Sequence, residues 1–540
     1  MIGIPGLREI IIGIIVISIA LVTHYVISKV DAKLEYLYIF LGEMFLLLFV
    51  LFSQLSEIQG LVRDHNAYIK KYLNNHYLLF ESLQRNLHRV FWKMRKIACC
   101  EVLAFVIASG IIITGISLQL MINPSPVLAS LQPKQNITLA VIFNDFNNHQ
   151  GKLLLDSAID KLRSNHPNLN INVKYVETTD RPVQPATLGT HDQLLRAIAN
   201  GTSIDVATID QIWLGEFAQK GYLTDLTNRS TSWGKLSDFY GQNIEGMTYN
   251  HKIYGIWPWT DVRGIWYWKD LLNKAGIDPN SLKTWGGYIE SARKLNSFLR
   301  SEGIEGVNLA AADQSPDVWY PSLWMLGGQI LTSKNGHLFP AYNSSAGVKA
   351  MEFIKAQVDA GIQPQNKWLG GKEFANRNFS VMIDGSWMPS WIPKHELSDI
   401  GFIPMFPVPT GNTNTTTLMG GWEFSIPKTS THKDIAWELI QIMLEPGILT
   451  PWIAEQGFLP TQISIGQGYS PYIDQLRKSI PFFDQMISMV PEAQVRPSVA
   501  EYPAIARDIR QAIDEVCFGS KDPKQALQEA AAKSAKALGW

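Results

Sequence analysis

Three long apolar runs near the start of this 540-residue chain constrain its structure more than any other feature. They cover residues 10–28, 36–55 and 101–122, and each has the length of about 19 residues or more that a helix needs to cross a membrane. We therefore expect an α-helical membrane region over 1–123 with three transmembrane helices. A cleaved signal peptide is the alternative for the first run, although that run lacks a convincing small-x-small cleavage site and two further runs follow it.

The basic residues predict how this membrane region is oriented. The segment 57–96 has eight Lys and Arg residues against three acidic ones, and such residues are retained on the cytoplasmic side. We expect this segment to be cytoplasmic and helical, because its apolar residues follow an amphipathic spacing. It either links two spans as a helical hairpin or forms a docking surface for another membrane protein. Everything after about residue 123 is then expected outside the plasma (inner) membrane.

The chain changes character after a Pro- and Ser-containing linker at 124–135. A buried strand is expected at 137–143, a helix follows with apolar residues at the helical period, and a second strand is expected at 169–177. The same order recurs up to a helix that ends at Gly221. Repeated units of this kind predict an α/β fold with a parallel sheet covered by helices on both faces.

Later segments indicate two α/β lobes with a ligand cleft between them, because strand-like segments return after a helical stretch and the chain is too long for one core. The whole outer domain covers 136–540. The expected lobes are composed of several segments each: approximately 136–258 and 404–460 for the first, and approximately 260–402 and 465–540 for the second.

The bulk composition excludes several classes of function. The net charge of −1 gives no reason to expect a nucleic acid or an acidic polymer as partner. Cys99 and Cys100 are neighbours and Cys517 stands alone, so we expect no disulfide framework and a free or buried thiol at Cys517. No cluster has zinc spacing and no Gly-Lys pair is followed by Ser or Thr. We expect no metal and no cofactor.

Tryptophan is concentrated in the outer part, which holds all of the 17 tryptophans except Trp92. One face of a pyranose ring stacks on an indole while acids, amides and guanidinium groups bond its hydroxyls. Pairs of this type recur at the ends of expected strands, where adjacent glycines also let backbone approach a ligand. They are Asp210 with Trp213, Trp259 with Asp261, Trp387, and Trp422 with Glu423 after Gly420 and Gly421.

The stretch 255–272 contains four tryptophans with divided roles. We expect Trp259 to contact ligand and Trp266 and Trp268 to pack in the core, and we leave Trp257 undecided. Arg263 either faces the cleft or orients Asp261, because buried arginines are normally paired.

Several phrases resemble the extracellular solute-binding proteins of ABC sugar importers, the group that contains maltose- and trehalose-binding proteins. The resemblance runs from about residue 136 to the C-terminus and keeps the family's order. Its phrases are IDVATIDQIWLGEFAQKGYLTDL, KIYGIWPWTDVRGIWYWKDLLNKAGID, FSVMIDGSWM, LMGGWEFSIPKTSTHKDIAWELIQIML, QGFLPT and RPSVAEYPAIARDIRQAIDEV.

This resemblance implies a two-lobed periplasmic-binding-protein clamp of type II that closes around an oligosaccharide. In such proteins an acid after the third strand bonds sugar hydroxyls, and Asp210 resembles this acid. Trp387 resembles the indole that lies under one sugar ring. The other positions implied are Asn144 in the first loop, Trp259 and Asp261 beside the first hinge, Gly420, Gly421 and Trp422 in the loop that closes over the ligand, and Arg496 as the late arginine that reaches the cleft.

The resemblance also implies a function without chemistry, the delivery of sugar to the permease and ATPase subunits of an importer. The chain departs from the family in its expected spans, which would tether the clamp to the membrane. Two alternatives stay open. One is a sugar sensor that signals through the spans, and the other is a membrane-anchored glycosidase, whose site would also combine tryptophans with carboxylates.

Overall fold

A computed structural model describes residues 135–142, 150–175, 186–310, 315–362, 364–365, 371–409, 411–412, 414–467 and 470–540. All of them lie in the second of the chain's two units, Ser125–Trp540. The expected spans, the cytoplasmic segment 57–96, Cys99 and Cys100 lie outside the described residues. Within the ranges given above, no helix combines the length and the hydropathy that a membrane span requires.

The first lobe is built on a five-stranded sheet with the order β2-β1-β3-β16-β6. β1 is parallel to β2 and β3, whereas β16 is antiparallel to both β3 and β6. The sheet is therefore mixed, not wholly parallel as its repeated units predict, because β16 enters from the other lobe and runs in the opposite direction. Its strands are Gln135–Ile142 (β1), Leu169–Tyr175 (β2), Val206–Asp210 (β3), Gly255–Ile256 (β6) and Trp422–Ser425 (β16).

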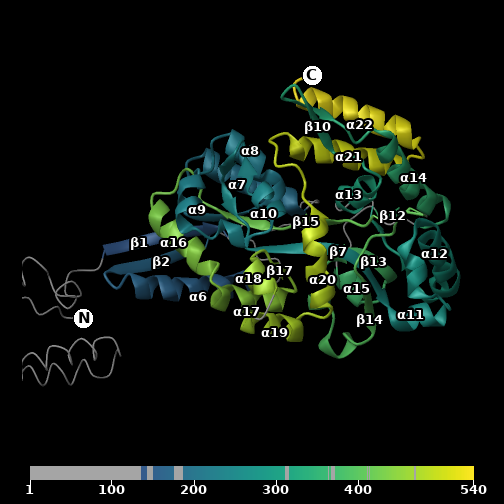
Figure 1. The fold of residues 1–540 in the computed structure, drawn as a ribbon, viewed down its shortest axis with the longest axis horizontal. Coiled ribbons are helices and arrows are strands. Elements are labelled where there is room, and N and C mark those ends of the chain that lie inside the picture. Colours follow the sequence, from purple (N-terminus) through teal and green to yellow (C-terminus); the bar gives the residue numbers. More distant parts are fainter. Residues whose placement is uncertain are drawn as a thin grey trace, which may run out of the picture. The chain divides into compact units, whose positions relative to one another are not determined.

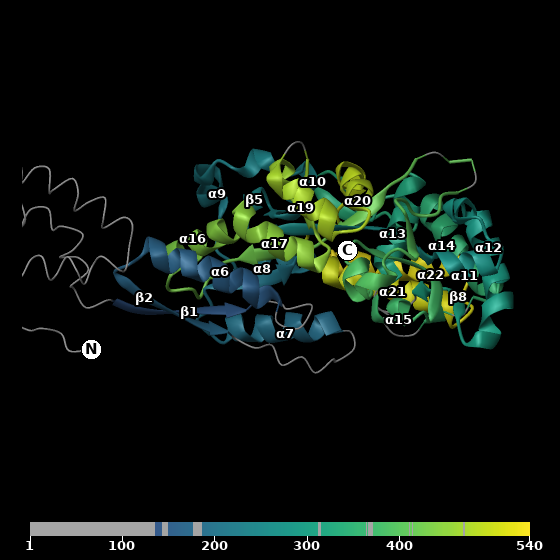
Figure 2. The same ribbon diagram turned by 90° about the horizontal axis from the view of Figure 1, so that it is seen from below.

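Helices cover both faces of this sheet, as the alternation of strands and helices predicts. In Figures 1 and 2, α6 and α7 lie on opposite sides of β1. The apolar residues of α6 at the helical period, including Leu154, Leu155 and Leu162, are buried. The helices of this part of the molecule are Gln150–Asn165 (α6), Ala186–Ala199 (α7), Leu214–Gln219 (α8), Thr227–Trp233 (α9), Gly241–Gly246 (α10), Lys433–Met443 (α16), Pro446–Gln456 (α17), Ile463–Gly466 (α18) and Pro471–Ser479 (α19).

The second lobe is organised around one long strand, β7, which runs from Trp259 to Trp268 and pairs with four others. The sheet has the order β18-β15-β7-β13-β8, with β14 and β17 also on β7. Its other strands are Glu305–Val307 (β8), Phe379–Gly385 (β13), Ile400–Ile403 (β14), Thr417–Gly420 (β15), Leu459–Pro460 (β17) and Ala493–Gln494 (β18).

Helices surround this second sheet, and the C-terminal pair α21 and α22 packs on α14 (Figure 1). The helices are Lys269–Lys274 (α11), Trp285–Leu299 (α12), Ser315–Met325 (α13), Ser345–Asp359 (α14), Gly371–Ala375 (α15), Phe483–Met489 (α20), Tyr502–Cys517 (α21) and Pro523–Ala537 (α22). Cys517 ends α21 as a free buried thiol, which confirms the prediction for this residue.

The segments that connect the two sheets are short. Only Trp257 and Pro258 separate β6 of the first sheet from β7 of the second, and only Gly421 separates β15 from β16. The two-lobed α/β architecture is thus present. β15 falls within 404–460, which we expected in the first lobe, yet it pairs with β7 and β18; the exact lobe boundaries remain a proposal.

Candidate functional site

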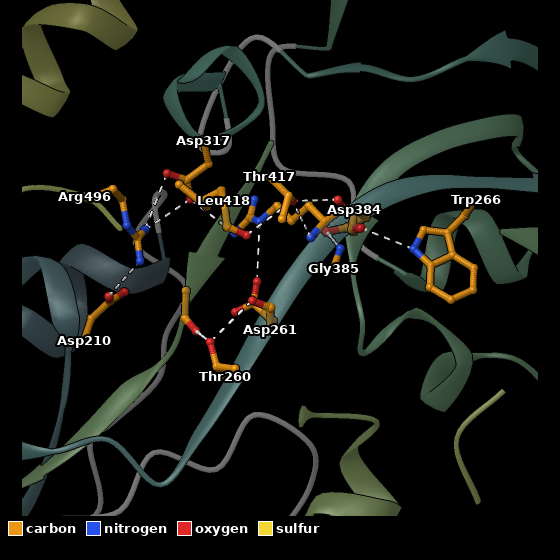
Figure 3. A network of polar contacts seen from close by, with 12 residues as sticks. Asp210, Thr260, Asp261, Trp266, Asp317, Asp384, Gly385, Thr417, Leu418 and Arg496 are labelled. Atoms are coloured by element: carbon orange, nitrogen blue, oxygen red, sulfur yellow. Dashed lines mark hydrogen bonds and ion pairs between the residues drawn. The ribbon is translucent and has the colours of Figure 1, made fainter. Parts of the chain in front are cut away.

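Five charged side chains form an alternating chain of acids and bases where the two sheets meet (Figure 3). Arg496 lies 3.7 Å from Asp210 through its Nη2 and 3.2 Å from Asp317 Oδ2 through its Nη1. Arg263 Nη2 lies 3.2 Å from the same Asp317 oxygen, and its Nε lies 3.7 Å from Asp261 Oδ1. We call these five residues the charge network.

Local structure explains why these side chains converge. Asp210 is the last residue of β3, and its carboxylate accepts a hydrogen bond of 3.3 Å from the backbone N–H of Ile212 at the start of the next helical turn. Asp261 and Arg263 are two residues apart on β7, so the strand period places both side chains on one face. Arg496 follows β18, and its carbonyl accepts from Gln211 Nε2 at 3.0 Å. The network therefore combines elements of both sheets.

Burial dominates the electrostatics of the network. Asp261 and Arg263 are 5% and 6% exposed, and burial raises the pKa of Asp261 to about 6, an effect that Arg263 and then Arg496 oppose. Burial is also the largest cause of the raised pKa of Asp210, again opposed by Arg496. The pKa of Arg496 is raised by Asp317 and Asp210, although burial works against it. Asp317 and Asp210 thus favour the charged form of Arg496.

The network has unused hydrogen-bonding capacity. Asp261 Oδ1, Nε and Nη1 of Arg263, and Nε of Arg496 are buried and make no hydrogen bond to a described residue. Buried polar groups are normally satisfied, so such groups at the meeting point of two lobes mark a place for a polar ligand or water. One acceptor and three donors can together bond several hydroxyls.

Trp387 brings an aromatic face to this network. It lies two residues after the end of β13, and its ring centroid is 5.4 Å from the guanidinium carbon of Arg263. A cation at this distance is attracted to the ring. The indole is half-buried and so retains accessible surface. Trp387 is the tryptophan best placed to stack on a ligand held by the charge network.

Trp422 and Trp213 lie on the first-sheet side of the site. Trp422 is directly opposite Asp210 in the pairing of β16 with β3, which brings two expected site residues together. The rings of Trp213 and Trp422 meet edge to face at 5.1 Å, and both residues are buried. Glu423 is fully buried on the opposite face of β16 and makes no hydrogen bond to a described residue.

Glycine is required at positions 420 and 421 because neighbouring side chains lie close to the backbone there. Gly420 pairs with Asp261, and a Cβ there would lie 2.8 Å from the Asp261 carboxylate. Gly421 has a φ of +153° at the crossover into β16, and a Cβ there would lie 2.0 Å from the indole nitrogen of Trp257. A side chain at either position would therefore collide with Asp261 or Trp257.

Trp259 lies apart from the charge network. It is 1% exposed and is surrounded by the rings of Trp452 at 4.4 Å, Phe424 at 5.7 Å and Phe458 at 5.8 Å. This environment favours a packing role for Trp259, in contrast to our expectation of ligand contact, which no observation tests directly. Trp257 is also fully buried.

Trp266 and Trp268 are core residues, as expected. Each is fully buried and donates its indole N–H to a backbone carbonyl, of Asp384 at 3.2 Å and of Phe374 at 3.0 Å. Asn144 lies outside the described residues.

Two roles were left open for Arg263. The structure shows that it pairs with Asp261 and also takes part in the charge network.

Asp317 is the network residue that sequence reasoning missed. It lies in the first turn of α13, bridges the two arginines, and has a side chain that is 18% exposed. No tryptophan–acid pattern at a strand end marks it, because it comes from a helix. Its role becomes clear only in the folded structure, where Arg263 and Arg496 both lie within ion-pair distance of it.

Comparison with known proteins places this chain among bacterial extracellular solute-binding proteins. Residues 149–448 match the model of a family described as bacterial extracellular solute-binding protein. A binding protein of Brucella abortus is 24% identical over 354 residues, which cover 63% of this chain and 81% of the relative. An arabinooligosaccharide-binding protein of Bacillus subtilis is 21% identical over 363 residues, with the same two shares.

A solved structure supports the fold alone. The ABC transporter solute-binding protein of Thermotoga lettingae, bound with alpha-D-tagatose, superposes with a TM-score of 0.63 at 21% identity, covering 75% of this chain and 100% of that one.

Proposed function

The chain belongs to the family of bacterial extracellular solute-binding proteins, and from this membership we propose that it captures a sugar or oligosaccharide between its two lobes for an ABC importer. An arabinooligosaccharide-binding relative and a tagatose-bound structural neighbour support the ligand class. The observation that carries the proposal is the convergence of the charge network and Trp387, because each lobe alone holds only part of the site.

The chemistry of the site favours a neutral, hydroxyl-rich ligand. Three carboxylates face two guanidinium groups in the network, so its formal charge is −1 when all five are ionised. An anionic ligand would have to displace an acid from an arginine, at the cost of separating a buried pair. A hydroxyl can instead accept from an unused guanidinium N–H and donate to Asp261, without breaking an ion pair.

The experiment that tests the proposal is a calorimetric titration of the full-length chain against a panel of mono- and oligosaccharides, repeated on Trp387→Ala. Stacked aromatic anchors are worth about 2 kcal/mol, so the variant should bind about 30-fold more weakly. Trp540→Ala is the matched control, since Trp540 is 52% exposed at the C-terminus and should leave affinity unchanged. Equal affinity of natural chain and Trp387→Ala would refute the site.

Trp422→Ala should also weaken binding, but Trp422 supports Trp213 through a ring contact, so loss of folding could mimic loss of affinity. Trp422→Phe keeps an aromatic ring in place and separates the two effects. We retain the wider proposal for Asp210, Asp261 and Arg496 as groups that bond sugar hydroxyls from the two lobes.

The membrane-tethered form of this function rests on residues 1–123. Tethering raises the effective concentration of the clamp at its permease. The expected topology places the short link around residues 29–35 and everything after about residue 123 outside, and the segment 57–96 inside. Fusion of a periplasm-active reporter after residues 30, 60 and 130 tests it, with activity expected after 30 and 130 and absent after 60. Activity after residue 60 would overturn it.

Co-purification of the membrane-embedded chain distinguishes the importer from a sensor. Permease and ATPase subunits are the partners expected of an importer, whereas a kinase or cyclase would indicate signalling. Incubation with the oligosaccharide that binds tests the glycosidase alternative, because turnover of that ligand would remove the binding-only function.

A further inference from the structure

A second aromatic concavity lies in the first lobe, between α9 and α16. In Figure 1 these helices lie toward the end of the lobe that holds β1 and β2, away from β15 and β7. The cavity has a volume of about 360 Å³, which is within the range of small-ligand pockets. Its lining residues are Asn228, Arg229, Ser232, Trp233, Trp437 and Gln441.

Two indoles at fixed angles form the apolar wall. Trp233 ends α9, and its ring meets Trp437 of α16 edge to face at 6.0 Å and 83°. Trp437 is 7% exposed and supports its neighbour from the core, whereas Trp233 is only half-buried. Phe239 holds Trp233 from another direction at 6.1 Å. Lys235 Nζ lies 5.6 Å from the centroid of the Trp233 ring, so a sugar that stacks on that face must displace this flexible side chain. Trp233 thus keeps accessible surface between two supporting rings.

The polar wall carries side chains without partners. The half-buried amide of Gln441 and the exposed amide of Asn228 and hydroxyl of Ser232 make no hydrogen bond to a described residue, so a ligand can bond them in place of solvent. Arg229 is fixed by Asp434, whose Oδ1 accepts from its Nη2 at 2.6 Å. The pair neutralises the charge of the arginine, while its remaining N–H groups can still donate. Amides can both donate and accept, which suits a hydroxyl-bearing ligand.

We propose that this concavity is a second carbohydrate site, which takes one neutral pyranose unit on Trp233. An indole beside two amides, a hydroxyl and a neutralised guanidinium supplies the stacking face and the hydrogen bonds that such a ring needs. The site is built from one lobe alone and so does not depend on closure. A long glycan held here would increase the local concentration of chain ends at the interlobe site.

Fluorine NMR of the full-length chain labelled with 5-fluorotryptophan tests the proposal. The Trp233 and Trp387 signals are assigned with Trp→Phe variants, and maltotriose, arabinotriose and cellotriose are the probes. We expect at least one trisaccharide to move the Trp233 signal in a saturable way. Trp285 is the control indole, because it is half-buried and stacked on Phe353 at 4.6 Å outside both sites, so its signal should stay fixed.

Gln441→Leu provides the decisive variant, because it removes a polar partner from the wall while leaving both indoles. It should weaken the response of Trp233 about tenfold, the effect of one lost hydrogen bond, and leave the response of Trp387 unchanged. A fixed Trp233 signal with all three sugars, or an equal response in Gln441→Leu, overturns the second site. The Trp387 signal reports the interlobe site independently.

Discussion

Replacing Asp261 by Asn should stabilise the protein at neutral pH and have little effect in acid. Burial raises the pKa of this carboxyl from 3.8 to about 6, so ionising it costs more in the folded chain than in the unfolded one. The difference corresponds to about 3 kcal/mol. Near about pH 4 the group is protonated in the folded chain and partly protonated in the unfolded one, so little of the cost remains. The cost is fully present above about pH 7, where the group is ionised in both states. Asn resembles the protonated carboxyl at every pH.

Urea unfolding of the natural chain and of Asp261→Asn at about pH 4 and about pH 8 measures this cost. We expect equal free energies of unfolding in acid, and a variant more stable by up to about 3 kcal/mol at the higher pH. Asp160→Asn is the matched control, since its side chain is 79% exposed and its change should stay within about 0.5 kcal/mol.

The reasoning would be refuted by a variant that is as stable as the natural chain at about pH 4 but less stable at about pH 8. That result would mean that the attraction of Asp261 to Arg263 and Arg496 outweighs the cost of burial. In either case the variant should bind sugar more weakly, because an Asn amide offers one acceptor oxygen where the carboxylate offers two.

Three further changes test other parts of the site by urea unfolding. Arg496→Met leaves Asp210 without its ion-pair partner and Asp317 with Arg263 alone, and should destabilise the protein by about 3–5 kcal/mol, whereas Arg496→Lys should retain part of that stability. Gly421→Ala should cost about 1–3 kcal/mol, since φ is +153° and the new Cβ would meet Trp257, while Gly241→Ala meets no atom within 4 Å and should be tolerated. Glu423→Gln should be neutral at about pH 4 and increasingly stabilising as the pH rises, because burial, and then Asp210, hold the pKa of Glu423 well above its usual range.

The regular parts of the fold could be predicted because local patterns determine them. The apolar run that becomes β1 and the helical period that becomes α6 each occur within one segment. The direction of β16 could not be predicted in this way. It depends on the crossover at Gly421, which turns a chain leaving the second sheet into an antiparallel strand of the first.

The site was predictable to the extent that its residues carry local signals. Asp210 and Asp261 stand at or beside strand ends next to tryptophans, and the structure places both in the charge network. Trp259 carries the same signal yet is packed among three aromatic rings, because strand twist and the neighbouring helix α17 decide which way it points. Asp317 carries no such signal, since its partners come from positions more than 50 residues away.

The proposed ligand site and the crossovers between the two sheets involve the same few residues. Arg496 reaches Asp210 on the first sheet and Asp317 in the second lobe, so any change in lobe spacing alters these ion pairs. The crossovers at Trp257–Pro258 and Gly421 adjoin the same place, because Gly421 contacts Trp257 and its neighbour Gly420 contacts Asp261. The unused groups of the network belong to Asp261, Arg263 and Arg496, and Arg496 in turn pairs with Asp210 of the first sheet. If the two lobes close on a ligand, as the proposed function requires, a ligand that bonds these groups would shift the equilibrium between open and closed forms to the extent that it contacts the two forms differently.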